Sequence, residues 1–403
     1  MRGKAGSAKP GSEGLRPSGG ARQMGRFRSS AIRAWELIER PAAMTLPTKM
    51  QAMVLTRHGD LNAYAWHEDW PVPVPAAGDV LVEVGATGLN NTDVNTRTGW
   101  YSKAVTQATT GGAYAEVSDE DPAWGGSPIH FPRIQGADVC GRVVAVGEGV
   151  DPARIGERVI TDNWLRDADD LGNLEKTGYY GSERDGGYAQ FATMPARNAL
   201  AINSPLSDAE LATFSCSYST AEGMLERAHV TAADTVLVPG ASGGVGGALV
   251  QLAKRRGARV IAMASEAKHA AVATLGPDRI LPRAPANLRG ALGDERVTVV
   301  ADITGGPQFS ALIEVLERGG RYTCSGAIAG PIVDLDLRTL YLKDLTFTGS
   351  TVIGPQVMPN LIRYIEEGAI KPVLAATYPL RDLRAAQSAF IAKEHTGNIV
   401  VIP

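Results

Sequence analysis

The spacing of apolar and polar residues changes about halfway along the chain. From Gln51 to about Ala201, short apolar runs are separated by Gly, Pro and Asp, which predicts the strands of a β-rich domain. After about Leu206, helical and strand patterns alternate, which predicts a parallel, doubly wound sheet. Two polar stretches, 102–130 and 165–184, are too long for ordinary connections. Loops of this kind often shape or cover a site, and disorder is an equal alternative.

The second half divides into predicted elements by the same spacing. Helices are predicted at 208–230 and 310–320, and strands at 235–238, 259–264, 279–281, 297–304 and 319–327. The tail, 344–403, returns to strands with two helical segments and ends in a strand at 398–403. The chain is therefore predicted to be an α/β protein of two domains, and its length of 403 residues is sufficient for two cores.

The segment 235–264 combines the order strand, tight turn, helix, strand with a glycine-rich turn, PGASGGVGG. This order is typical of the unit that binds the pyrophosphate of a dinucleotide. Glycines lack Cβ, so backbone N–H groups can approach phosphate oxygens closely. An ordinary glycine-rich turn is the alternative, which the flanking strand and helix make less favoured. The predicted cofactor-binding residues are Gly240, Ser242, Gly243, Gly244, Val245 and Gly246.

Charge and composition exclude several classes of partner. The chain is 44% hydrophobic and 21% charged with a net charge of −3, which gives no electrostatic case for nucleic acid or a membrane surface. The longest uncharged stretch, 235–253, contains a proline and five glycines, so we do not expect a membrane span there. The three cysteines, Cys140, Cys216 and Cys324, show no CxxC spacing, which predicts a reducing, cytoplasmic location.

The beginning of the chain differs from the rest in charge. Residues 1–50 hold ten Lys/Arg against three Asp/Glu, whereas the remainder holds 30 against 40. Residues 1–43 are rich in Arg, Gly and Ser and show little periodicity, which predicts disorder. A transit peptide is one interpretation. We favour a non-native extension, with the functional chain beginning at Met44 or Met50, because no apolar signal core is present.

Several motifs, in order, resemble the medium-chain dehydrogenase/reductase superfamily, most closely its zinc-independent quinone oxidoreductase (zeta-crystallin-like) branch. They are GDVLVEVGATGLNNTDVNTRTGWY, IQGADVCGRVVAVGEGV with GERV, DGGYAQF, PGASGGVG and TGNIVV. The resemblance implies a GroES-like catalytic domain at 50–200, to which 346–403 returns, and a Rossmann domain at 206–345. A short-chain reductase is excluded because the glycine loop is not N-terminal and no tyrosine is followed by lysine four residues later.

The resemblance also bears on metal binding. Zinc-dependent relatives supply a Cys, a His and a second Cys at the positions that hold Asn90, Ala137 and Cys216 in this chain. A catalytic zinc normally needs three protein ligands, and one remains, so no metal site is expected. Cys216 is then interpreted as a buried apolar residue. Asp138 and Cys140 lie on one face of a predicted strand without a third ligand.

The stretch after the motif GLNN carries the candidate catalytic residues. In quinone reductases an asparagine and an aspartate three residues later flank the nicotinamide, and a tyrosine follows; Asn90, Asp93 and Tyr101 match this pattern. A further tyrosine common in the branch is Asn95 here, which puts the proton donor in doubt. The alternative interpretation is a helix N-cap, which the same residue types also favour.

The end of the predicted strand 259–264 indicates the cofactor. Ser265 and Lys268 resemble residues that bind the 2′-phosphate of NADPH in this branch, whereas Glu266 could serve the ribose of NADH. NADPH is therefore favoured and NADH stays possible. Gly326 and Ala327 are expected near the nicotinamide, and Asn398 near the nucleotide, by the same resemblance.

The resulting hypothesis is an NADPH-dependent, zinc-independent oxidoreductase that transfers a hydride to a small-molecule quinone or α,β-unsaturated carbonyl. One alternative is an alcohol/aldehyde dehydrogenase of the same superfamily with an unorthodox metal site. Another is an NADPH-binding protein with low turnover. Relatives pair through the sheet edge of the nucleotide domain, so a homodimer or homotetramer is expected.

Overall fold

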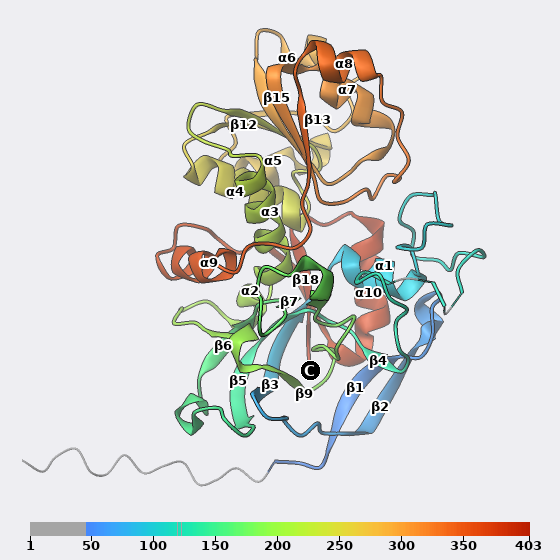
Figure 1. Cartoon of the computed structure of the whole chain (residues 1–403), viewed down its shortest axis with the longest axis vertical. Coiled ribbons are helices and arrows are strands. Elements are labelled where there is room, and N and C mark those ends of the chain that lie inside the picture. The colour runs from blue at the N-terminus through green and yellow to red at the C-terminus, as the bar shows by residue number, and fades with distance from the viewer. Residues whose placement is uncertain (1–45, 119, 122) are drawn as a thin grey trace, which may run out of the picture. The chain divides into compact units, whose positions relative to one another are not determined.

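The computed structural model describes residues 46–118, 120–121 and 123–403, so the predicted extension at 1–43 lies outside the described residues. Residues 47–403 contain two large sheets, one mainly antiparallel and one parallel (Figure 1). The chain is an α/β protein with a β-rich part and a part built on a parallel sheet, which confirms the predicted fold class.

The β-rich part is built on a seven-stranded sheet in the order β10-β6-β5-β3-β18-β17, with β9 pairing to β3. Its strands are β3 (Asp79–Gly88), β5 (Asp138–Val146), β6 (Arg158–Thr161), β9 (Phe191–Pro195), β10 (Ala199–Ala201), β17 (Leu374–Pro379) and β18 (Asn398–Ile402). A second sheet contains β1 (Lys49–Leu55), β2 (Tyr64–Pro71) and β4 (Arg133–Ile134), and a hairpin contains β7 (Trp164–Leu165) and β8 (Gly178–Tyr179). The tail thus returns to the β-rich sheet through β17 and β18.

The parallel sheet has the strand order β13-β12-β11-β14-β15-β16, which is the order of a dinucleotide-binding fold. Its strands are β11 (Thr235–Val238), β12 (Arg259–Ala264), β13 (Arg279–Pro282), β14 (Val297–Asp302), β15 (Leu316–Cys324) and β16 (Thr346–Gly349). Alternate side chains enter different cores: Val236 and Val238 pack on one face, and Leu237 on the other. Both faces are therefore buried, as a doubly wound sheet requires.

Helices cover both faces of the parallel sheet. The helices are α1 (Asn91–Thr98), α2 (Asp208–Leu211), α3 (Ser215–Arg227), α4 (Gly244–Arg255), α5 (His269–Ala273), α6 (Leu288–Leu292), α7 (Phe309–Glu314), α8 (Leu337–Leu342), α9 (Val357–Glu366) and α10 (Leu383–Ala392). Helices α3, α4 and α9 share the core of Val236, whereas α6 and α7 share the core of Leu237. Within the described part of the chain, no helix is long and apolar enough to cross a membrane.

Three predicted boundaries differ from the structure. The predicted helix 208–230 is two helices, because a capping box of Ser207 and Glu210 closes the short α2 and residues 212–214 separate it from α3. The predicted helix 310–320 stops at Glu314, since Leu316 already begins β15. Residues 346–349, assigned from the sequence to the returning segment, instead pair with β15 in the parallel sheet.

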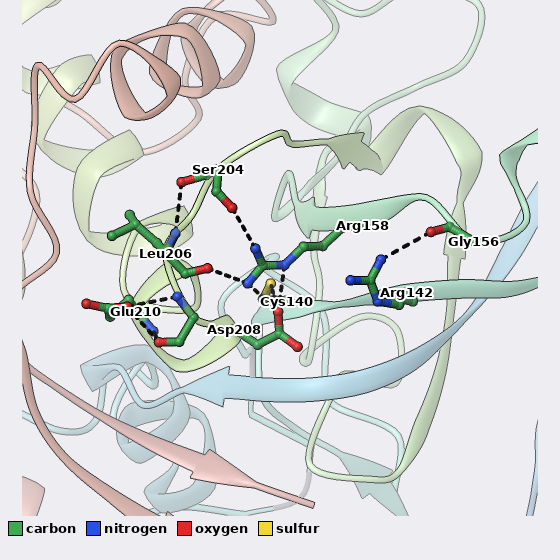
Figure 2. Close-up of polar contacts among 9 residues, drawn as sticks. Cys140, Arg142, Gly156, Arg158, Ser204, Leu206, Asp208 and Glu210 are labelled. Atoms are coloured by element: carbon green, nitrogen blue, oxygen red, sulfur yellow. Dashed lines mark hydrogen bonds and ion pairs between the residues drawn. The ribbon is translucent and has the colours of Figure 1, made fainter.

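Arg158 fastens the point where the chain leaves the β-rich sheet for the nucleotide-binding part. Its guanidinium donates to the carboxylate of Asp208 at 2.7 Å and to the backbone oxygens of Ser204 and Leu206 at 3.0 and 2.6 Å (Figure 2). The thiol of Cys140 donates to the same carboxylate at 3.4 Å. The connecting loop is therefore bound along its length to β6 before α2 begins.

Candidate functional site

A cleft of about 840 Å³ lies where the two parts of the fold meet. The nucleotide-binding part contributes the residues at the carboxyl ends of β11, β12, β14 and β15, which is where open parallel sheets bind ligands. The β-rich part contributes the start of α1, and the tail contributes the segment between α10 and β18. The volume lies within the range of small-molecule and cofactor sites.

The glycine loop between β11 and α4 forms one wall of this cleft. Gly240 has a φ of +67°, a left-handed conformation that favours glycine. A Cβ on Gly246 would lie 2.1 Å from the backbone oxygen of Gly240, so only glycine permits this close approach. The N–H groups of the first turn of α4 have no acceptor within the helix, and Gly243, Gly244 and Val245 line the cleft. The loop is a cradle suited to a phosphate.

The tail of the chain holds the glycine loop in place. The N–H of Gly397 donates to the backbone oxygen of Ser242 at 2.9 Å. The side-chain amide of Asn398 donates to the hydroxyl of Ser217 on α3 at 2.9 Å. Across the cleft, the loop after β15 that contains Gly326 and Ala327 also lines the wall.

Basic side chains gather at the end of β12. Ser265, Lys268, Arg283 and Lys393 all line the cleft. The ammonium of Lys268 donates to the backbone oxygens of Lys393 and His395 at 2.5 and 2.7 Å. Burial, followed by the nearby Arg283, lowers the pKa of Lys268. Among the described residues, none of these three cations forms an ion pair with a carboxylate.

Lys393 is the most perturbed of these groups. Its ammonium donates to the side-chain oxygen of Asn91 at 3.0 Å and lies 3.6 Å from the ring centroid of Phe390. Burial, and then the charge of Lys268, lowers its pKa to about 7. The same surroundings, burial first, lower the pKa of His395 to about 4. This corner of the cleft has excess positive charge, which an anion would neutralise.

Asn90 belongs to a buried polar cluster at the other end of the cleft. Its side-chain amide donates to one carboxylate oxygen of Asp138 at 2.9 Å. The other oxygen accepts from the side chain of Asn163 at 2.8 Å and from the backbone N–H of Cys216 at 2.9 Å. Burial raises the pKa of Asp138 to about 7, although these donors oppose the rise. Asp138 therefore fixes the orientation of Asn90.

Asp93 does not line the cleft. Its carboxylate accepts from the backbone N–H of Asn90 at 2.8 Å and from that of Gly136 at 3.3 Å. Burial raises its pKa to about 6. Asp93 thus caps the first turn of α1, the structural alternative considered from the sequence, and positions Asn90 from behind.

Tyr101 lines the cleft just after α1. Burial raises the pKa of its phenol to about 12, and hydrogen bonds with the side chains of Thr92 and Asn95 oppose the rise. Asn95, which stands where the branch has a tyrosine, also accepts from the hydroxyl of Thr109 at 3.1 Å. The phenol is therefore neutral at ordinary pH and can act as a hydrogen-bond donor.

The structure brings most of the predicted site residues together. The cleft is lined by Asn90, Tyr101, Gly240, Ser242, Gly243, Gly244, Val245, Ser265, Lys268, Gly326, Ala327 and Asn398. Asp93 and Gly246 lie behind it, where the first caps a helix and the second allows the loop to close. Five further residues line the cleft that no sequence motif indicated: Arg283, Lys393, Trp124, Trp164 and Tyr179. A basic residue just after a predicted strand was the signal available for Arg283.

The cysteines take separate partners. Cys216 and Cys324 line the cleft, whereas the thiol of Cys140 donates to the carboxylate of Asp208. Burial is the largest cause that raises the pKa of each of the three thiols. In the ranges that the structure describes, no three His, Cys, Asp or Glu side chains are grouped as metal ligands would be.

Comparison with known proteins identifies the family. Residues 76–204 match the model of the alcohol dehydrogenase GroES-like domain, and residues 244–367 match that of the zinc-binding dehydrogenases. The crystal structure of a putative alcohol dehydrogenase from Sinorhizobium meliloti is 46% identical, with a TM-score of 0.80, and the match covers 89% of this chain and 98% of that one. The chain belongs to the medium-chain dehydrogenase/reductase superfamily.

Curated relatives show that this member of the superfamily is an oxidoreductase. The acryloyl-coenzyme A reductase of Metallosphaera sedula is 26% identical over 339 residues, which cover 82% of this chain and 93% of the relative. The quinone oxidoreductase of Rattus norvegicus is 27% identical over 351 residues, covering 84% and 92%. The resemblance inferred from the motifs is therefore confirmed at the level of the superfamily.

Proposed function

We propose that this medium-chain oxidoreductase is an NADPH-dependent, zinc-independent reductase of quinones or α,β-unsaturated carbonyl compounds. The observation that carries the proposal is that one cleft joins a glycine cradle and a basic corner to the polar cluster around Asn90. The first two features suit a phosphorylated dinucleotide, and the third provides uncharged polar groups for a carbonyl. Its partner is thus a small-molecule acceptor.

The basic corner supports NADPH. Lys268 and Arg283 lie with Ser265 at the ends of β12 and β13, where the ribose of a dinucleotide is bound in this fold. Glu266, the residue that would favour the ribose hydroxyls of NADH, does not line the cleft. Cations without carboxylate partners are best neutralised by a 2′-phosphate. NADH stays possible as a weaker cofactor.

The residues at the other end suit reduction of a polarised double bond. When bound, the reduced nicotinamide supplies a hydride; together with one proton this saturates a carbon–carbon double bond or reduces a quinone. Negative charge then develops on the acceptor oxygen and must be stabilised by hydrogen-bond donors. Tyr101, held neutral by its raised pKa, can donate such a bond. Asn90, oriented by Asp138 and capped by Asp93, lines the surface that the acceptor faces.

The cluster around Asp138 supports activity without zinc. Asn90 and Ala137 stand where zinc-dependent relatives have Cys and His, which leaves Cys216 as the sole matching ligand. Both carboxylate oxygens of Asp138 are already occupied by N–H donors, so Asp138 is a poor substitute ligand.

The test is oxidation of NADPH with a panel of quinones and enones, followed by the loss of nicotinamide absorbance. We expect turnover that prefers NADPH to NADH, is unaffected by a chelator, and accompanies a negligible metal content by mass spectrometry. Turnover that follows added zinc would contradict the proposal. Nucleotide binding without turnover of any acceptor would favour a binding protein instead.

An alcohol dehydrogenase is the second candidate, because the 46% identical structure is that of a putative alcohol dehydrogenase and Cys216 is retained. It predicts reduction of NADP⁺ with primary or secondary alcohols and a stoichiometric metal. The same panel, run with alcohols and the oxidised nucleotide, separates the two functions.

A further inference from the structure

Three aromatic rings pack together at the acceptor end of the cleft. The ring centroids of Trp124, Trp164 and Tyr179 lie 5.1 to 5.2 Å from one another, and all three side chains line the cleft. Trp164 and Tyr179 are only 4% and 3% exposed. We call these three residues the aromatic subsite. Its rings are tilted or edge-on to each other, as stable aromatic clusters require.

The aromatic subsite takes one residue from each of the two polar stretches of the first half of the chain, and a third from the residue just before the second stretch. Trp124 comes from 102–130 and Tyr179 from 165–184, and Tyr179 faces Trp164 across the β7–β8 hairpin. One side chain, Glu183, fastens the two stretches together. Its carboxylate accepts from the N–H of Gly125 at 2.9 Å and from that of Tyr179 at 2.7 Å. The subsite is therefore positioned by specific contacts.

Both polar and aromatic side chains lie near the aromatic subsite. The phenol of Tyr179 accepts from the side chain of Asn163 at 3.2 Å, which also donates to Asp138 in the cluster that orients Asn90. A second aromatic pair, Trp100 and Tyr101, lines the same cleft with ring centroids 5.8 Å apart. A ligand in this end of the cleft thus meets flat apolar rings beside polar groups suited to one oxygen.

We propose that the aromatic subsite selects acceptors whose reducible carbonyl system is conjugated to an aromatic ring, such as aryl enones and fused-ring quinones, over small aliphatic ones. This inference rests on the proposed function, since it names the class of acceptor for the same site. Flat conjugated rings gain both apolar burial and stacking against Trp and Tyr. Among the described residues of the two stretches, Trp124 and Tyr179 line the cleft, and neither offers a cation to a phosphate-bearing acceptor.

The decisive experiment compares 4-phenyl-3-buten-2-one with 3-penten-2-one, which differ only by phenyl in place of methyl. With NADPH, the wild-type enzyme is expected to show kcat/KM at least about tenfold higher for the phenyl enone. Trp124→Ala should bring this ratio close to one, because the phenyl ring loses a stacking partner that the methyl group never used. Trp70→Ala removes an indole on β2 that does not line the cleft, and it should leave the ratio unchanged.

A second variant keeps the subsite testable if Trp124→Ala fails to fold. Glu183 is exposed, and Glu183→Ala removes the link to Gly125 together with the bonds that Glu183 accepts from Tyr179 and Ser182 in its own stretch. Acting as a positioning residue, it should lower the phenyl-to-methyl ratio, whereas a merely structural role would lower kcat/KM for both enones alike. An equal kcat/KM for both enones in the wild type, or an unchanged ratio in both variants, overturns the aromatic subsite.

A binding measurement separates this proposal from the proposed function. Calorimetric titration with two unreactive ketones, 4-phenyl-2-butanone and 2-pentanone, needs no turnover. The phenyl ketone should bind about tenfold more tightly to the wild type and lose this advantage in Trp124→Ala. Tight binding of the phenyl ketone without NADPH oxidation overturns the reductase and supports the subsite. Turnover with equal affinity for both ketones overturns the subsite and supports the reductase.

Discussion

Lys393 couples the protonation of the protein to the charge of its ligand. Burial and the neighbouring Lys268 lower its pKa to about 7. Its neighbours are Lys268, His395 and Asn91, and Lys268 in turn is affected by the charges of Arg283 and Glu394. Because the unfolded protein binds more protons than the folded one between about pH 7 and the ordinary lysine pKa of about 10.4, stability should rise with pH across that window.

Binding of NADPH should therefore take up a proton. A 2′-phosphate in the basic corner favours the charged form of Lys393, so its pKa rises in the complex and the affinity falls as pH increases above about 7. Calorimetric titrations at pH 8 in two buffers of different ionisation enthalpy measure the uptake. NADH, which lacks this phosphate, is the control. Equal proton uptake with both nucleotides would contradict the assignment of the corner.

Lys268 should discriminate between the two cofactors. Removing its ammonium in Lys268→Ala is expected to raise the KM for NADPH about tenfold or more and to change that for NADH by less than about threefold. Lys254→Ala is a matched control, since Lys254 pairs with Asp278 on the surface at 2.8 Å. Steady-state kinetics with both nucleotides measure the effect. A similar loss for the two cofactors would show that Lys268 only holds the backbone of 393–395.

At the scale of the element, two glycines of the β11–α4 turn should respond differently to substitution. A Cβ at Gly243 meets its nearest atom at 3.6 Å and the backbone is extended, so Gly243→Val should fold but place its side chain in the phosphate cradle. NADPH binding, measured by calorimetry, should be abolished. A Cβ at Gly246 collides with backbone, so Gly246→Ala should instead lower the free energy of unfolding by about 1–3 kcal/mol. If Gly243→Val bound NADPH with wild-type affinity, the glycine loop would not be the phosphate-binding part of the cofactor site.

Periodicity predicted most elements because burial repeats along each of them. The strands β11, β12 and β14 have side chains buried on both faces, and this gives nearly continuous apolar runs. The break after α2 could not be predicted in the same way, because Ser207 and Glu210 also suit one uninterrupted helix. The strand β16 carries half-exposed and exposed residues at the sheet edge, so its sequence resembles a connection.

The site was predictable where a local motif defines it, and less so where distant segments meet. Gly240 and Gly243 lie in one glycine-rich turn between a strand and a helix, and this local pattern is enough to predict a phosphate-binding loop. Trp124 and Tyr179 are 55 positions apart, in stretches without periodicity. The contact between these stretches depends on a third residue, Glu183, whose carboxylate accepts from the N–H groups of Gly125 and Tyr179. Such a contact follows from the tertiary fold alone.

At the scale of the whole molecule, exposed apolar side chains gather in the segment that precedes the edge strand of the parallel sheet. Five of the ten exposed large hydrophobic residues of the described chain fall within 332–342, just before the edge strand β16: Ile332, Val333, Leu337, Tyr341 and Leu342. Grouped apolar residues of this kind are typical of an interface. We expect a homodimer through this surface, or a tetramer that includes it.

Charge placed in this surface should dissociate the assembly. Leu337 and Tyr341 lie one turn apart on α8 and are 63% and 62% exposed, so replacing both with Asp should not disturb the core. Light scattering after size exclusion should then change the mass from that of a dimer to that of a monomer. The exposed Val74, replaced by Asp in the β-rich part, is the control. A monomeric wild type would exclude this interface.

The low reactivity of the two cysteines in the cleft has a consequence for the lifetime of the enzyme. Enones and quinones are electrophiles that alkylate thiolates, and Cys216 and Cys324 lie in the cleft that is proposed to bind them. Burial raises the pKa of both thiols, so very little thiolate is present at neutral pH and adducts form slowly. Intact-protein mass spectrometry after prolonged turnover should find these cysteines unmodified. The fold would then protect the enzyme from poisoning by its own substrates.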